Sequence, residues 1–139
     1  MILLDTSGLL SALFVDQRHH AECARVLREV DGPLVLSPFV LAELDYLVGK
    51  LAGVEAELRL LTDVSRGAYE LATFTTEDVE HAQGLIGRFR DLHIGLADAS
   101  LVVLADRLNA RSILTLDARH FRALHGARGR PFRLLPFDS

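Results

Sequence analysis

The chain lacks most of the residues and motifs that announce a particular chemistry. Cys23 is the only cysteine, so no internal disulfide can form and a reducing, cytoplasmic compartment is expected. There is no P-loop, no GxGxxG motif and no GxSxG elbow, which argues against nucleotide-binding and serine-hydrolase sites of those types. Several histidines have no zinc-ligand spacing and are expected to be ordinary surface or core residues: His81, His93, His120 and His125.

Long hydrophobic runs are also absent. The longest uncharged apolar stretch, residues 33–42, ends at Glu43, far short of the roughly 18 residues that a membrane span needs. The first residues contain no basic segment and reach an acid at Asp5, so no signal peptide is expected. We therefore predict no membrane association.

The charge balance is mildly acidic. The net charge of −4, from 15 basic and 19 acidic residues, argues against a protein that holds nucleic acid by general electrostatics. It does not exclude an enzyme whose acids are concentrated in a metal cleft. Residues 119–133 differ from the rest because they contain no acid and several arginines. This segment is either a solvated face or a rim that contacts RNA phosphates through Arg119 and Arg122. Its arginines are Arg119, Arg122, Arg128, Arg130 and Arg133.

Short apolar runs alternate with longer amphipathic ones along the whole chain. With 139 residues, the chain fits one domain spanning residues 1–139. The alternation predicts an α/β fold with a parallel central sheet flanked by helices. The predicted strands are 2–4, 34–36, 69–74, 112–116 and 132–135. The predicted helices begin at Leu9 and cover 38–50, 54–66, 76–92, 97–109 and 117–124.

Two acids follow predicted strands directly. Asp5 ends the strand 2–4 and Asp117 ends the strand 112–116. Ligands of parallel sheets bind beyond the carboxyl ends of the strands, so both acids lie at the edge where chemistry is expected. Either acid alone could simply cap the helix that follows it.

Two further acids lie on predicted helices with apolar faces. Glu43 has apolar residues at its helical neighbours, and a charge in such a stripe needs a partner. Asp45 is placed almost as well, since this helix is apolar nearly all round. Asp98 begins an apolar helix and could instead complement the helix dipole. Periodicity leaves these alternatives open.

Converging carboxylates would need a cation. Two of them ~4 Å apart repel by about 4 kcal/mol at an effective dielectric of 20, and some would otherwise take up protons. Oxygen-only ligands favour Mg²⁺ or Mn²⁺ over zinc. Such ions suit phosphodiester hydrolysis, because they polarise the phosphoryl oxygen and lower the pKa of a bound water.

Four segments together resemble the PIN-domain family, and most closely its VapC toxins. Residues 2–7 resemble the opening strand with its Asp-Thr-Ser ending, and 37–44 resemble the segment whose glutamate is the second acid. Residues 96–101 resemble the Asp-Ala segment, and 113–121 resemble the closing strand with Thr-x-Asp and a later Phe. His120 departs from the pattern, because the family often has Asp before this Phe.

The resemblance implies a metal-dependent endoribonuclease, the toxin of a type II toxin–antitoxin pair, that cuts RNA with Mg²⁺, or Mn²⁺ as a substitute. It implies that Asp5, Glu43, Asp98 and Asp117 hold the metal and position water, and it favours Glu43 over Asp45. Auxiliary hydroxyl contacts would come from Thr6, Ser7 or Thr115. The expected partners are an RNA substrate, a cognate antitoxin and a second copy of the chain in a homodimer.

Three alternatives remain from the sequence. A phosphoacceptor receiver domain needs a lysine near its last strand, whereas Lys50 is the only lysine. A PIN scaffold without activity would serve only as a binding module, but all four family acids are present. A PIN nuclease of RNA processing differs from a toxin in its genetic neighbour, not in its own motifs.

Overall fold

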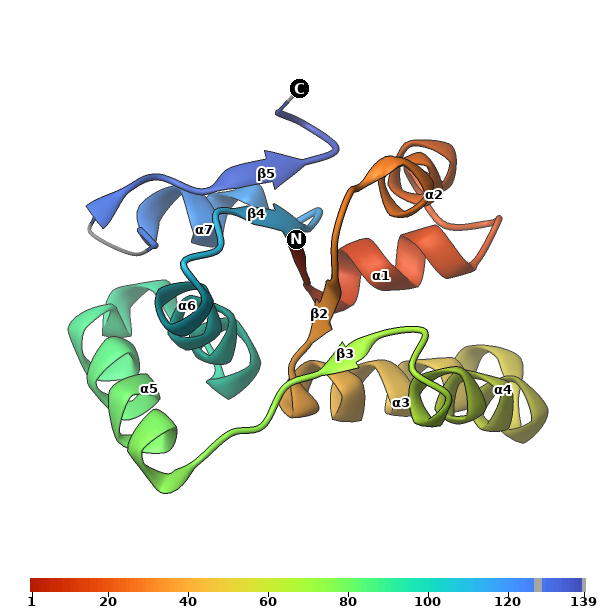
Figure 1. The fold of residues 1–139 in the computed structure, drawn as a ribbon, viewed down its shortest axis with the longest axis horizontal. Helices are drawn as coiled ribbons and strands as arrows, with labels where there is room; N and C mark the ends of the chain where they lie inside the picture. The colour runs from red at the N-terminus through yellow and green to blue at the C-terminus, as the bar shows by residue number, and fades with distance from the viewer. Residues whose placement is uncertain (127–128, 139) are drawn as a thin grey trace.

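The computed structural model describes residues 1–126 and 129–138 and contains a five-stranded parallel sheet (Figure 1). The strand order is β3-β2-β1-β4-β5. Central strand β1 pairs with β2 on one side, where Leu3 faces Val35, and with β4 on the other, where Leu3 faces Ile113. The predicted α/β fold with a parallel sheet is confirmed. The strands are β1 (Ile2–Leu4), β2 (Leu34–Leu36), β3 (Glu70–Leu71), β4 (Ser112–Leu114) and β5 (Arg133–Leu135).

Helices cover both faces of this sheet. Figure 1 shows α1 and α2 on one side of the strands and α5 and α6 on the other. None of the helices in the described ranges is long and apolar enough to cross a membrane. The helices are α1 (Thr6–Leu13), α2 (His20–Glu29), α3 (Pro38–Ala52), α4 (Val54–Ser65), α5 (Thr76–Arg88), the 3-10 turn η1 (Arg90–Leu92), α6 (Leu96–Leu108) and α7 (Ala118–Ala123).

Burial explains why β1 and α6 are apolar at consecutive positions. All three residues of β1 are fully buried, as expected for a strand with helices on both faces. In α6, every residue from Ala99 to Ala105 is buried, and β1 is among the elements it contacts. Asp98 therefore begins a helix whose position is fixed by the core.

The helix predicted from Leu9 onward is in fact two helices. Helix α1 ends at Leu13, where Phe14 takes an extended conformation, and α2 begins after His19, which has a left-handed conformation with φ of 59°. The intervening residues 14–19 are mostly polar and have no helical apolar period to extend the buried face. The predicted strand 69–74 is likewise shorter, because β3 covers only Glu70–Leu71.

The strand order places a topological switch at the centre of the sheet. The chain moves outward from β1 through β2 to β3 and then returns to the other side of β1 with β4. Loops after β1 and β4 thus leave the sheet toward opposite faces, and a crevice opens between their carboxyl ends. Asp5 follows β1 and Asp117 lies three residues beyond β4, so both are at this crevice.

Gly8 allows α1 to lie directly against β4. A Cβ atom added at Gly8 would be 2.5 Å from the carbonyl oxygen of Leu114 and 2.7 Å from its side chain. The Leu114 carbonyl is fixed, since it accepts a hydrogen bond from the Asp5 amide at 3.0 Å. A side chain at residue 8 would therefore push α1 away from the end of β4.

We predict that Gly8→Ala lowers the free energy of unfolding by about 1–3 kcal/mol, the usual range for overpacking. Gly84→Ala in α5 is the matched control, because nothing lies within 4 Å of its added Cβ and alanine favours a helix by about 0.5–1 kcal/mol over glycine. Urea denaturation of both variants measures the difference. Equal stability of the two variants would show that α1 can move without cost.

Candidate metal centre

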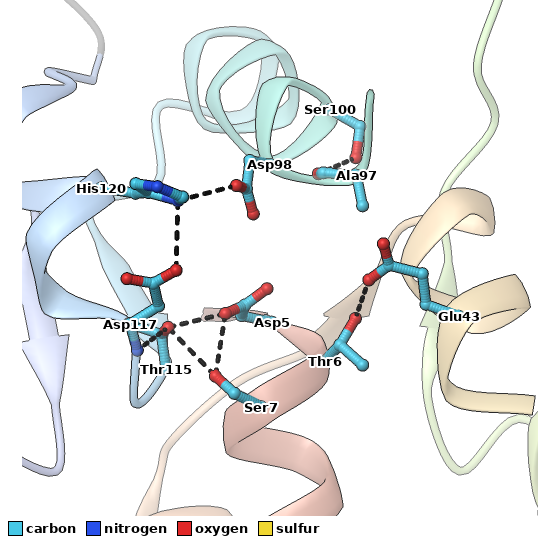
Figure 2. A network of polar contacts seen from close by, with 10 residues as sticks. All are labelled: Asp5, Thr6, Ser7, Glu43, Ala97, Asp98, Ser100, Thr115, Asp117 and His120. Carbon is cyan, nitrogen blue, oxygen red and sulfur yellow. Dashed lines mark hydrogen bonds and ion pairs between the residues drawn. The ribbon is translucent and has the colours of Figure 1, made fainter. Parts of the chain in front are cut away.

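Asp5 lies almost buried at the end of β1, with one carboxylate oxygen held by two hydroxyls. Asp5 is 5% exposed. Thr115 Oγ1 donates to Asp5 Oδ2 at 2.6 Å, and Ser7 Oγ donates to the same atom at 3.0 Å. Figure 2 shows the other oxygen pointing toward the space between the acids.

Backbone amides fix these two hydroxyls in turn. The Leu116 N–H donates to Ser7 Oγ at 3.0 Å, and the Asp117 N–H donates to Thr115 Oγ1 at 2.9 Å. Each hydroxyl has its own proton left for Asp5, because an amide occupies it as an acceptor. The turn after β4 therefore sets the orientation of the carboxylate that follows β1.

Glu43 reaches the same space from α3. Thr6 Oγ1 donates to Glu43 Oε1 at 2.7 Å, and Figure 2 shows the carboxylate on the side of α3 that faces Asp5. Asp45 is directed elsewhere: it interacts with Glu57 of α4, and its charge and hydrogen bond raise the pKa of Glu57. The structure thus separates two acids that periodicity could not.

His120 links the remaining two acids. Its Nδ1 lies 3.1 Å from Asp98 Oδ2 and 3.1 Å from Asp117 Oδ2. The side chain of Asp98, on α6, is 20% exposed, whereas that of Asp117 is 42% exposed. His120, which the sequence predicts to be an ordinary surface or core histidine, lies among the acids (Figure 2). The signal in the sequence was its position three residues after Asp117, one helical turn away.

Two buried serines lock together the helices that carry Glu43 and Asp98. Ser37 Oγ and Ser100 Oγ are 2.7 Å apart, and Ser100 Oγ donates to the carbonyl oxygen of Ala97 at 2.6 Å. Because the Ser100 proton is used there, Ser37 donates to Ser100. Ser37 also accepts from the Phe39 amide at 3.1 Å, so it caps the start of α3. The contact to Ser100 had no signal in the sequence, since 63 positions separate the two residues.

The acids share an unfavourable electrostatic environment. Burial raises the pKa of Asp5 to about 6, hydrogen bonds from Thr115 and Ser7 oppose this, and the charge of Asp98 adds to it. Burial also raises the pKa of Asp98, and the charges of Asp117 and Glu43 act in the same direction. His120 lowers the pKa of Asp98 and so relieves part of the repulsion.

These features fit a divalent cation. The donors are carboxylate oxygens, which suit hard ions, and a cation would remove the repulsion that raises the two pKa values. Within residues 1–126 and 129–138, however, no three Asp, Glu, His or Cys side chains lie close enough to form a complete ligand set. Asp5, Glu43, Asp98 and Asp117 instead surround a common space (Figure 2), and their role as metal ligands stays a prediction.

The arginines of residues 119–133 do not act as one group. Arg122 forms a two-fold ion pair with Asp138, at 2.8 and 2.6 Å, so its guanidinium already supports the C-terminal turn. Arg119 is exposed and has no hydrogen bond or ion pair with any described residue. Arg128 lies outside the described residues. A role of Arg119 in RNA contact stays a prediction, and the same role for Arg122 would require it to leave Asp138.

Comparison with known proteins identifies the family. A family model for the PIN domain matches residues 2–126. The chain belongs to the PIN-domain family. It is also 43% identical over 135 residues to ribonuclease VapC26 of Mycobacterium tuberculosis, covering 97% of this chain and 100% of that protein. The predicted relation to the VapC group of PIN domains is confirmed.

Solved structures of PIN-domain proteins share the fold at low sequence identity. VapC20 of Mycobacterium tuberculosis, described as a toxin that cleaves the sarcin-ricin loop, has a TM-score of 0.78 at 17% identity, covering 84% of this chain and 90% of its own. VapBC2 of Rickettsia felis, bound to a promoter DNA fragment, has a TM-score of 0.67 at 21% identity. The match covers 96% of this chain and 98% of that chain. At these identities the likeness concerns the fold alone.

The raised pKa of Asp5 predicts how stability depends on pH in the absence of metal. Folding raises this pKa from 3.8 to about 6, so the folded state binds the proton more tightly than the unfolded chain. Stability is therefore lost as the pH rises from about 4 to about 6, by up to about 3 kcal/mol from this group. Asp5→Asn should remove this loss, and in EDTA near neutral pH it should be about 1–3 kcal/mol more stable than the wild type.

Urea denaturation in EDTA across this pH range measures the effect. Asp106→Asn is the control, because Asp106 is an exposed acid on α6, the same helix as Asp98. If the free energy of unfolding depends on pH in the same way in the wild type and in Asp5→Asn, the assignment of a buried carboxyl with a raised pKa at residue 5 is wrong.

Proposed function

We propose that this PIN-domain protein is the toxin of a type II toxin–antitoxin pair and acts as an endoribonuclease. In this proposal Asp5, Glu43, Asp98 and Asp117 hold Mg²⁺, with Mn²⁺ as a substitute. The observation that carries the proposal is the convergence of these acids at the crevice between β1 and β4 (Figure 2). The near-complete alignment with a protein named as a ribonuclease supports the reaction type.

A bound divalent cation would polarise the phosphate and lower the pKa of a water molecule. The chain supplies the geometry. Asp5 is oriented in advance by Thr115 and Ser7, so little reorganisation is needed when the site fills. Glu43 is held by Thr6 and is placed across the crevice from Asp117, where it can orient a water by hydrogen bonding.

His120 has a separate task in this arrangement. Its Nδ1 contacts one carboxylate oxygen of Asp98 and one of Asp117. Each carboxylate keeps acceptor sites for a cation, since it has two oxygens with about four lone-pair sites in all. His120 can therefore orient the two acids without using all of their acceptor sites.

Two other functions are compatible with the fold. An inactive PIN scaffold is disfavoured because all four acids face one crevice with raised pKa values at Asp5 and Asp98. A PIN nuclease of RNA processing would use the same site. It differs from a toxin in having no antitoxin and in being harmless when expressed alone.

We predict that the protein cleaves RNA with Mg²⁺ or Mn²⁺ and stops in EDTA. Asp98→Asn should reduce kcat by about 100-fold or more, as for loss of a group that stabilises transition-state charge. Asp106→Asn, on the same helix but exposed, should cleave like the wild type. Glu43→Gln should be inactive and Asp45→Asn active. Full cleavage in EDTA, or an inactive Asp45→Asn beside an active Glu43→Gln, would refute the assigned site.

An antitoxin surface is proposed on α3 and α4. Of the apolar residues in residues 38–66, Val40, Leu44, Val48 and Leu60 are buried in the core. Others are exposed and form what we call the α3–α4 patch: Tyr46, Leu51, Val54, Leu58 and Leu61, which are 63%, 57%, 60%, 52% and 38% exposed. Exposed apolar side chains gathered on two adjacent helices mark an interaction surface. Solved structures with this fold include toxin–antitoxin complexes, which supports an antitoxin as its partner.

A groove next to this patch suits an apolar side chain. It encloses about 180 Å³ between α1 and the α3–α4 pair, with apolar walls from Leu13, Phe14, Val48, Ala56 and Leu60, and two charged residues, Arg59 and Asp63, also line it. An amphipathic helix of the antitoxin could cover the patch and insert a residue here. An arginine from the antitoxin tail could then pair with the acids and compete with the cation.

We predict that the product of the neighbouring gene co-purifies with the protein and protects residues 38–66 from hydrogen exchange. Leu58→Asp should abolish co-purification, because it places a charge in an apolar interface. Val79→Asp on α5, where Val79 is 45% exposed, is the matched control and should bind normally.

Three outcomes separate the possibilities. Binding without protection of residues 38–66 would place the antitoxin elsewhere. Protection that depends on protein concentration and occurs without the neighbour would assign the patch to a homodimer. No binding and harmless expression would leave a nuclease of RNA processing.

A further inference from the structure

An open pocket adjoins the acids on the side of α1. It encloses about 320 Å³ and is lined by Ser7, Leu10 and Ser11 of α1, by Gln17 and Arg18 of the loop before α2, and by Leu116 and Asp117. Ser7 and Asp117 are also part of the metal centre, so the pocket and the crevice are continuous. Its volume is at the lower end of the range for small-ligand sites, roughly 300–1,000 Å³.

Two polar side chains of this pocket are available to a ligand. Neither the side-chain amide of Gln17 nor the guanidinium of Arg18 forms a hydrogen bond or ion pair with any described residue. Other arginines are used differently: Arg107 pairs with Asp78, and Arg122 pairs with Asp138. Arg18 is thus a free cation beside an acidic crevice that would by itself repel a phosphate.

The loop that carries Gln17 and Arg18 is held in place. His20 Nδ1 lies 2.8 Å from the carbonyl oxygen of Ser11, which ties the start of α2 to α1. The backbone N–H of Gln17 donates to the Phe14 carbonyl oxygen at 3.1 Å, and the backbone carbonyl of Gln17 accepts from the His20 backbone N–H at 3.3 Å. Because these bonds define the loop, the pocket exists before any ligand binds, which lowers the entropic cost of binding.

The side chains that line this pocket match the chemical groups of a single nucleotide. Leu10 and Leu116 offer apolar walls, against which the face of a base can lie. A primary amide such as that of Gln17 both donates and accepts, as reading a base edge requires. An arginine forms paired hydrogen bonds with a phosphate.

We propose that this pocket binds the nucleotide adjacent to the scissile phosphodiester of a single-stranded RNA. Arg18 contacts its phosphate, Gln17 reads its base edge, and Leu10 and Leu116 contact the base. This subsite rests on the proposed ribonuclease function and adds to it a determinant of sequence preference. It also assigns the phosphate-binding role to Arg18 of the α1–α2 loop, rather than to the Arg122 that pairs with Asp138.

The test compares Arg18→Ala, Arg18→Lys and Gln17→Ala with the wild type. Arg28→Ala is the matched control, because Arg28 is an exposed arginine on α2 that does not line this pocket. Cut sites of the wild type are first mapped on total RNA with Mg²⁺. Kinetics then use a short synthetic oligoribonucleotide that spans one mapped site, together with versions that change the base on either side of the cut.

Arg18→Ala should raise KM about tenfold, equivalent to about 1.4 kcal/mol, with little change in kcat. Arg18→Ala should also reduce the salt dependence of kcat/KM by the equivalent of about one phosphate contact. Arg18→Lys should keep most of the wild-type salt dependence, because lysine retains the positive charge. Gln17→Ala should relax the base preference next to the cut and leave the salt dependence unchanged. Arg28→Ala should behave like the wild type.

The outcomes separate this proposal from the function on which it rests. If the wild type cuts RNA but Arg18→Ala and Gln17→Ala match it in KM, salt dependence and base preference, the subsite is wrong and the nuclease stands. If these variants lose antitoxin binding while RNA cleavage is unchanged, the pocket belongs to the antitoxin and the subsite is wrong. If the wild type cuts no RNA with either metal, both proposals fall. Thermal melting of each variant confirms that it is folded.

Discussion

The structure depends on a carboxylate buried at the end of its central strand. Asp5 is 5% exposed, and the charge that acts on it is that of another acid, Asp98. Such a group is costly unless it is hydrogen-bonded, and Thr115 and Ser7 supply those bonds. Both hydroxyls are themselves held by the backbone after β4. The burial of the Asp5 carboxylate therefore fixes the relative positions of three segments. These are the end of β1, the first turn of α1 and the turn after β4.

The parallel sheet makes this relation possible. Its strand order brings β1 and β4 together from distant parts of the chain, and the absence of a side chain at Gly8 lets α1 approach the Leu114 carbonyl. Helices α3 and α6 then bring Glu43 and Asp98 to the same crevice, joined by the contact between Ser37 and Ser100. Electrostatic repulsion within this group is a cost to folding that a cation would remove.

The surfaces around the crevice differ in their chemistry. The α3–α4 patch is apolar and lies beside a groove suited to a protein segment. The α1–α2 loop instead presents an unpaired arginine and an amide next to the acids. His120 contacts both Asp98 and Asp117. A partner and a substrate can thus approach the same centre from different elements.

The sequence by itself determined the α/β alternation, the positions of Asp5 and Asp117 at strand ends, and the family motifs, because these depend on local apolar patterns and short spacings. It could not decide between Glu43 and Asp45 by periodicity, since α3 is apolar nearly all round. Only the tertiary structure directed Glu43 to Thr6 and Asp45 to Glu57. It also decided that the stretch after Leu13 is a loop, that Arg122 pairs with Asp138, and that His120 lies between two acids. These features join residues brought together by the packing of α1, α3, α6 and α7 around the sheet, and a linear pattern carries no information about such distances.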